Sequence, residues 1–342
     1  MHLRRSVPVI GLVALLALAG CGTGSGTPGP STSDASSLTV GLGYIPNVQF
    51  APFYLAQQNG YYRDAGLTVT FQNKIDPDLV TLVGQGTLDI GLADGTSVIP
   101  AVSQGIPIRY VATVYRQFPS IVFAKLGSGI AKAADLKGRK IGIPGRYGSS
   151  WIMLQALLRS AGLKPEDVRI TEYPDFGQGA AVQQDAVDAA TGFVNNEPIQ
   201  LEQGGSKPVV LHVDDIVPLP GPGLIAGTKA LESKRAAITA FIAATLRAMR
   251  EIEADPKAGL KATAAAVPDL SGSADLQAAV LDATIAAWKG TGGPEGFGSI
   301  DSAAWARSID YMSGLVDFTT KAPLVAKPVK VEDVVDSGLV KG

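Results

Sequence analysis

The stretch that decides the fold is Gly86-Thr87-Leu88-Asp89-Ile90-Gly91-Leu92-Ala93-Asp94, because Asp185-Ala186-Val187-Asp188-Ala189-Ala190-Thr191-Gly192-Phe193 repeats its pattern later in the chain. Each stretch predicts the end of a helix, then a hydrophobic residue and an aspartate, and then a buried strand that leads into a polar loop. In open α/β sheets, ligands bind outside the carboxyl ends of the strands. Two copies of this unit therefore predict two lobes whose polar loops face each other across a cleft. Such a cleft suits a small molecule and closure about a hinge.

Short β-rich segments alternate with helical patterns on both sides of this repeat, which predicts an α/β fold of parallel sheets covered by helices. Lobe 1 is expected to comprise residues 38–118 and 228–325, and lobe 2 residues 119–227, with 326–342 as a C-terminal tail. The expected strands are 38–43, 67–71, 88–93, 108–114, 120–124, 139–143, 168–173, 186–194, 208–213 and 224–227. The expected helices include 52–60, 76–84, 97–104, 151–161, 178–184, 229–253, 276–288 and 301–312.

The first residues of the chain have the pattern of an export signal. Arg4 and Arg5 precede an apolar run from Val9 to Ala19, and that run is shorter than the roughly 20 residues that span a bilayer. Leu18-Ala19-Gly20-Cys21 then resembles the processing site of a bacterial lipoprotein. We therefore predict a signal peptide over 1–20, a lipid on Cys21, and a flexible Gly/Ser/Pro/Thr tether over 21–37. The folded part would lie on the extracytoplasmic face of the cell membrane.

Composition excludes several classes of function. The formal net charge is −2 and no basic stripe is present, so nucleic acid is not an expected partner. Cys21 is the only cysteine, and His2 and His212 are the only histidines. We therefore expect no Cys/His metal cluster, no cofactor and no disulfide. His212 lies in a predicted strand, which favours a structural role over a place in a Ser-His-Asp triad.

Polar and aromatic side chains recur in five loops at predicted strand ends, where they are candidates for ligand contact. Aromatic rings stack on planar ligands, amides bind hydrogen-bonding edges, and free N–H groups at a helix start hold acceptors. Several have a structural alternative: packing in the core for Phe50 and Tyr54, a helix cap for the loop of Asp94, pairing with a surface carboxylate for Arg116, and a bare acidic surface loop for Glu197. The candidate ligand-binding residues are Tyr44, Asn47, Gln49, Phe50 and Tyr54; Asp94, Gly95, Thr96 and Ser97; Tyr115 and Arg116; Arg146, Tyr147, Gly148 and Ser149; and Asn195, Asn196 and Glu197.

Four segments together resemble the periplasmic-binding-protein family that serves ABC importers of thiamine precursors, sulfonates and nitrate. They are GYIPNVQFAPFYLAQQNGYYRDAG (43–66), residues 88–97, DLKGRKIGI (135–143) and residues 192–198, within a similarity that runs from Leu38 to roughly Val325. The resemblance implies a two-lobed, type II-like fold with a ligand cleft between the lobes. The stretch from Tyr44 to Tyr54 is most similar to riboflavin and pyrimidine binders, and Glu197 falls where pyrimidine binders carry a glutamate that contacts the ring.

The resemblance therefore implies a monomeric, lipid-anchored receptor without catalytic residues, which captures a flat heteroaromatic vitamin or precursor. Riboflavin is the first candidate and a thiamine-related aminopyrimidine the second, delivered to an ABC permease and its ATPase. Because Arg116 and Arg146 could bind an anion, a receptor for sulfonate or nitrate is an alternative hypothesis. A secreted enzyme acting through Asp94, Tyr147 and Glu197 is a further alternative. A related branch makes the thiamine pyrimidine with a reactive histidine and a cysteine-rich motif, which this chain lacks.

Overall fold

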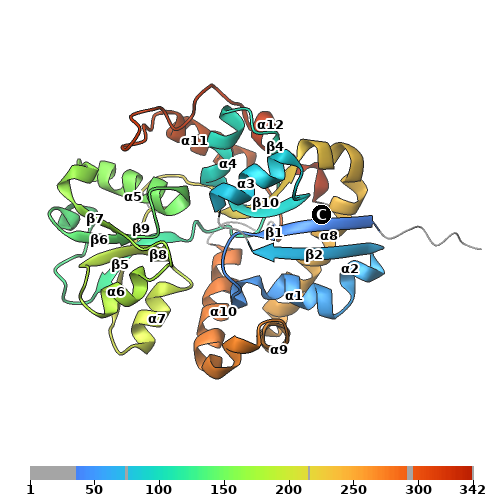
Figure 1. The fold of residues 1–342 in the computed structure, drawn as a ribbon, viewed down its shortest axis with the longest axis horizontal. Helices are drawn as coiled ribbons and strands as arrows, with labels where there is room; N and C mark the ends of the chain where they lie inside the picture. Colours follow the sequence, from blue (N-terminus) through green and yellow to red (C-terminus); the bar gives the residue numbers. More distant parts are fainter. Residues whose placement is uncertain (1–35, 74–75, 215, 291–295, 341–342) are drawn as a thin grey trace, which may run out of the picture. The chain divides into compact units, whose positions relative to one another are not determined.

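A computed structural model describes residues 36–73, 76–214, 216–290 and 296–340 (Figure 1). Cys21 and the signal peptide lie outside the described residues, as does the tether as far as Ala35. Within the described part of the chain, no helix combines the length and apolar character needed to cross a membrane.

The first lobe is built on a five-stranded sheet with the order β2-β1-β3-β10-β4. Strands β1, β2 and β3 are parallel, whereas β10 is antiparallel to both of its neighbours. The strands are β1 (Ser36–Leu42), β2 (Leu67–Asn73), β3 (Ile90–Asp94), β4 (Ile108–Thr113) and β10 (Pro222–Gly227).

The second lobe repeats this arrangement with the order β7-β6-β8-β5-β9. Strands β6, β7 and β8 are parallel, and β5 is antiparallel to β8 and β9. The strands are β5 (Ser120–Lys125), β6 (Lys140–Ile143), β7 (Arg169–Glu172), β8 (Ala189–Phe193) and β9 (Pro208–His212).

Both sheets are thus mixed, and the prediction of parallel sheets was wrong for β5 and β10. The two strands enter their sheets from the opposite lobe, at the edge where the parallel strands end. Ser120 at the start of β5 pairs with Phe193 at the end of β8, and Pro222 at the start of β10 pairs with Asp94 at the end of β3. A chain that arrives at the carboxyl edge of a sheet must run back along it.

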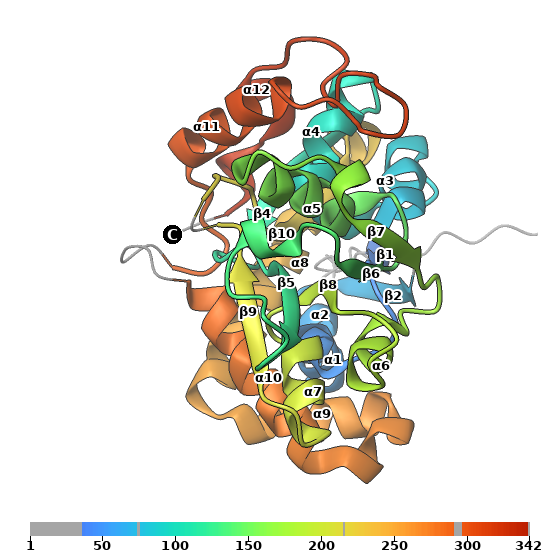
Figure 2. The same cartoon turned by 90° about the vertical axis from the view of Figure 1, so that its left-hand side faces the viewer.

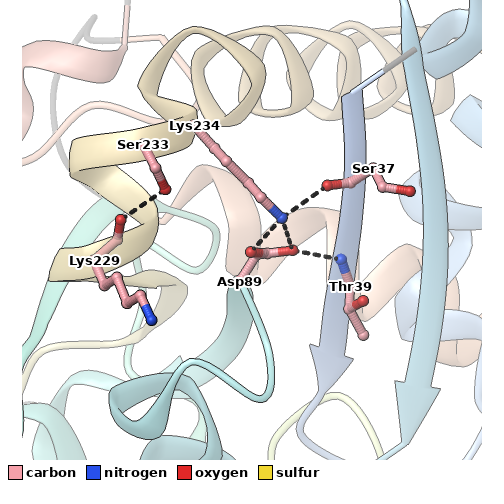
Figure 3. A network of polar contacts seen from close by, with 6 residues as sticks. All are labelled: Ser37, Thr39, Asp89, Lys229, Ser233 and Lys234. Carbon is pink, nitrogen blue, oxygen red and sulfur yellow. Dashed lines mark hydrogen bonds and ion pairs between the residues drawn. The ribbon is translucent and has the colours of Figure 1, made fainter. Parts of the chain in front are cut away.

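The repeated aspartates bind neighbouring strands in the same way. Asp89 Oδ2 accepts a hydrogen bond from the backbone N–H of Thr39 at 2.9 Å, and Asp188 Oδ2 accepts one from that of Lys140 at 2.7 Å. Figure 3 shows that Lys234 Nζ also reaches Asp89, at 2.8 Å, and the Ser37 carbonyl, at 3.0 Å. β3 begins at Ile90 and β8 at Ala189, directly after their aspartates and later than the expected starts at 88 and 186.

Helices pack around both sheets (Figures 1 and 2). Three belong to the second lobe: α5 (Gly148–Ser160), α6 (Gln178–Gln183) and α7 (Glu197–Gln203). The others are α1 (Ala51–Gln58), α2 (Tyr61–Asp64), α3 (Asp76–Gln85), α4 (Gly95–Ser103), α8 (Thr228–Ala254), α9 (Pro256–Ala266), α10 (Ala274–Lys289), α11 (Ser302–Ser313) and α12 (Val331–Val334).

The longest helix, α8, buries Ile238, Phe241 and Ile242 on the apolar face that its sequence predicts. The segment expected to be a tail packs on the first sheet, where Val334 is buried and Val335 forms a bridge with Tyr110 of β4. The two lobes also contact each other beside the chain crossings. Asn195, before α7, donates through Nδ2 to Thr284 Oγ1 of α10 at 2.8 Å, and Trp151 Nε1 of α5 donates to Asp317 at 2.8 Å.

Candidate functional site

A pocket lies between the lobes, at the carboxyl ends of the parallel strands of both sheets. It encloses about 890 Å³ of space free of protein atoms, including its solvent-open mouth. Its wall consists of Gly43, Tyr44, Gln49, Phe50, Leu92, Ala93, Asp94, Tyr115, Pro144, Tyr147, Gly148, Ser149, Ser150, Phe176, Gln178, Gly192, Phe193, Asn196, Glu197 and Pro222.

Glu197 supplies a buried carboxylate from the second lobe. It is the first residue of α7, and its Oε2 accepts the backbone N–H of Phe193 at 2.8 Å. Gln178 Nε2 donates to the other oxygen, Oε1, at 3.3 Å. Gly192 leaves room for this carboxylate, because a Cβ there would lie 2.8 Å from Glu197 Oε2. Burial raises the pKa of Glu197 from 4.5 to about 7, and the hydrogen bonds from the backbone oppose the shift.

Asp94 supplies a second buried carboxylate from the first lobe. It ends β3 and occupies the N-cap position of α4, as expected, but its side chain makes no capping hydrogen bond. Burial raises the pKa of Asp94 from 3.8 to about 6, while the nearby Ser149 hydroxyl of α5, from the other lobe, lowers it.

Aromatic rings form much of the remaining wall, and two of them meet across the cleft. Tyr44, after β1, contacts Phe176, after β7, with ring centroids 4.9 Å apart and planes at 83°. Phe176 has a φ of 60°, an uncommon conformation for a residue with a bulky side chain. Burial raises the pKa of Tyr44 well above its usual range, and the nearby Asn196 side chain opposes this shift. The described conformation therefore has aromatic side chains of both lobes in contact at the site.

The described pocket wall contains two carboxylates and no lysine, arginine or histidine. Arg116 and Arg146 lie outside it. Arg146 Nε binds Glu172 at 2.9 Å, and its guanidinium lies over the Trp151 ring at 5.3 Å. A buried anion requires a partner of opposite charge or strong donors. The wall therefore favours solutes that present N–H, O–H or cationic groups over sulfonate or nitrate.

Comparison with known proteins assigns the family. Residues 47–259 match the model of the family described as "NMT1/THI5 like". The chain belongs to this family. It is 30% identical to the riboflavin-binding protein RibY of Chloroflexus aurantiacus over 99% of both chains. It is 26% identical to the 4-amino-5-hydroxymethyl-2-methylpyrimidine phosphate synthase of Legionella pneumophila, over 54% of this chain and 58% of that enzyme.

Solved structures show the fold. The aliphatic sulfonate-binding protein SsuA of Escherichia coli superposes with a TM-score of 0.68, covering 88% of this chain and 97% of SsuA at 22% identity. The nitrate-binding protein NrtA of Synechocystis gives a TM-score of 0.54 over 68% of this chain and 66% of NrtA, at 15% identity. This NMT1/THI5-like chain therefore has the expected two-lobed periplasmic-binding-protein fold.

Ten of the eighteen predicted ligand-binding residues line the pocket of this NMT1/THI5-like protein. They are Tyr44, Gln49, Phe50, Asp94, Tyr115, Tyr147, Gly148, Ser149, Asn196 and Glu197. The other eight lie outside its wall: Asn47, Tyr54, Gly95, Thr96, Ser97, Arg116, Arg146 and Asn195.

Several of these eight have structural partners instead. Asn47 Oδ1 accepts the backbone N–H of Gln49 at 3.1 Å and caps a short 3-10 helix (Val48–Phe50). Tyr54 packs against the buried core cluster of the first lobe. Thr96 is fully buried in α4, and Asn195 holds Thr284 of the other lobe.

The sequence reasoning missed the loop that follows β7. Phe176 and Gln178 come from this loop and the start of α6. The rule that placed candidates at strand ends also applies after the strand expected at 168–173. The segment 173–179 carries aromatic rings, two glycines and an amide, the same signals that marked the other loops, so the sequence could have indicated it. Among the described residues, no group of three or more His, Cys, Asp and Glu side chains is placed to hold a metal ion.

The raised pKa of Glu197 predicts a pH-dependent stability for the ligand-free protein. Between about pH 4.5 and 7 the folded state holds a proton that the unfolded chain has released, so the free energy of unfolding falls as pH rises. The side chain of Glu197→Gln cannot ionise. We therefore expect the free energy of unfolding of this variant to exceed that of wild type by about 1–3 kcal/mol at pH 8. The difference should vanish near pH 4.5 in urea unfolding. Glu202→Gln, an exposed change on the same helix, should show no such trend. A gap that stays constant with pH would contradict the account.

Proposed function

We propose that this protein is the solute receptor of an ABC importer and captures a flat heteroaromatic vitamin or precursor, with riboflavin as the first candidate and a thiamine-related aminopyrimidine as the second. The observation that carries the proposal is the pocket wall, in which aromatic rings surround two buried carboxylates without a cation. The full-length similarity to a protein named for riboflavin binding supports the same ligand class.

The pocket wall can contact both the face and the edge of the ligand's ring system. Tyr44, Phe50, Tyr115, Tyr147, Phe176 and Phe193 provide ring faces and edges from both lobes. Each favourable ring pair contributes about 0.5–1.5 kcal/mol beyond area burial. Asp94 and Glu197 accept hydrogen bonds from ring N–H or hydroxyl groups, and these bonds strengthen when closure excludes water. Ligand binding then shifts an open-closed equilibrium that the permease recognises.

A receptor for sulfonate or nitrate is the second candidate within the same fold. Structural neighbours named for these ligands support the fold, at 22% identity or less. The absence of a cation from the described pocket wall disfavours such anions. An enzyme of thiamine-pyrimidine synthesis is the third candidate, because partial relatives carry that name. His212, the only histidine beyond the leader, lies on β9 and not in the pocket wall, which favours a receptor.

We infer that the receptor is a monomer tethered to the extracytoplasmic face of the membrane through a lipid on Cys21. The charged and apolar leader before Leu18-Ala19-Gly20-Cys21 supports this anchor. Cys21→Ser should shift the protein from the membrane fraction to the soluble fraction of its host. A wild-type protein that is already soluble, or a variant that stays with the membrane, would contradict the anchor.

Riboflavin binding tests the pocket assignment through two tyrosines of one segment. Tyr44→Ala removes a ring from the wall and should weaken binding about tenfold or more, as measured by quenching of flavin fluorescence. Tyr54→Ala changes a tyrosine outside the wall and should alter affinity less than threefold once folding is verified by thermal unfolding. Chemical turnover of riboflavin, or an equal loss in both variants, would contradict the proposal.

A further inference from the structure

Gln178 has a side chain whose orientation is fixed by its neighbour. It is the first residue of α6, only 1% exposed, and part of the pocket wall. Its Nε2 donates to Glu197 Oε1 at 3.3 Å. Above the Glu197 pKa of about 7 the carboxylate is ionised and only accepts hydrogen bonds, so the amide nitrogen faces Glu197 and the amide oxygen points elsewhere.

The amide oxygen of Gln178 is left without a partner. Oε1 is buried and has no hydrogen bond among the described residues. Buried acceptors are paired in most proteins, and an unpaired one is unfavourable. Because Gln178 belongs to the pocket wall, a donor on a bound solute is the partner that its position makes available.

We propose that Gln178 determines specificity by accepting a hydrogen bond from a ring N–H of the bound heterocycle, with Glu197 as the residue that positions its amide. The inference rests on the proposed function and adds the polar group that the solute must carry. The isoalloxazine ring of riboflavin has one such group, the N–H between the two carbonyls of its pyrimidine ring. Methylation of that nitrogen removes the donor and leaves the flat ring intact.

The chain offers a matched control on the same helix. Gln183 ends α6, and its Oε1 is also buried without a partner among the described residues. Its Nε2 donates to the Gly204 carbonyl at 2.8 Å, and Gln183 is not part of the pocket wall. Methionine is unbranched and similar in length to glutamine but cannot accept a strong hydrogen bond, so Gln178→Met and Gln183→Met remove the same group at two places.

The experiment measures the affinity of riboflavin and of its N3-methyl derivative at pH 8, where Glu197 is largely ionised. Wild type should prefer riboflavin about tenfold or more. Gln178→Met should bind riboflavin more weakly, with the preference reduced to less than threefold, whereas Gln183→Met should keep the wild-type preference. Thermal unfolding of both variants verifies that they fold.

The outcomes separate the inference from the function on which it rests. Failure of wild type to bind either flavin would overturn the choice of riboflavin, and with it this inference. Binding of both flavins by wild type without preference would overturn the role of Gln178 alone and leave the receptor intact. If Gln178→Met still prefers riboflavin over the N3-methyl derivative, the preference arises from crowding by the methyl group. That result would also overturn the role of Gln178.

Discussion

The site depends on the burial of two carboxylates in a cleft whose described wall contains no cation. Asp94 comes from the first lobe and Glu197 from the second, and burial raises the pKa of both. The Phe193 N–H and the Gln178 amide donate to Glu197, and the Ser149 hydroxyl lies close enough to Asp94 to lower its pKa. A buried carboxylate with no cation in the described wall disfavours a second anion beside it. The proposed ligand class rests on this charge balance.

The repeated aspartates explain why the cleft lies where it does. Asp89 and Asp188 each take an N–H from the neighbouring parallel strand, outside the ladder of β3 and β8. These two strands then end at Asp94 and Phe193, both in the pocket wall. The crossing strands β5 and β10 start beside those ends, so the connections between the lobes pass next to the site.

The sequence predicted the two-lobed fold because the hydrophobic-aspartate repeat is local and the apolar periods of the helices are strong. The direction of each strand was harder to predict from the sequence. Strands β5 and β10 are antiparallel because of the edge at which the chain enters each sheet, and no local sequence pattern indicates that edge. The site was predicted by the strand-end rule, which succeeded in bringing Tyr44, Asp94 and Glu197 to one cavity. The strand-end rule could not show that Asn47 hydrogen-bonds to Gln49 or that Arg146 pairs with Glu172. Nor could it show that Phe176, which has a positive φ, lines the pocket.

The most direct test is to identify the small molecule that accompanies the protein when it is purified from its own host, by native mass spectrometry followed by chromatography of the released compound. The account predicts a stoichiometric, chemically unaltered, flat heterocycle that is neutral or cationic and carries a ring N–H. Recovery of an aliphatic sulfonate, nitrate or another small anion from the cleft would contradict it.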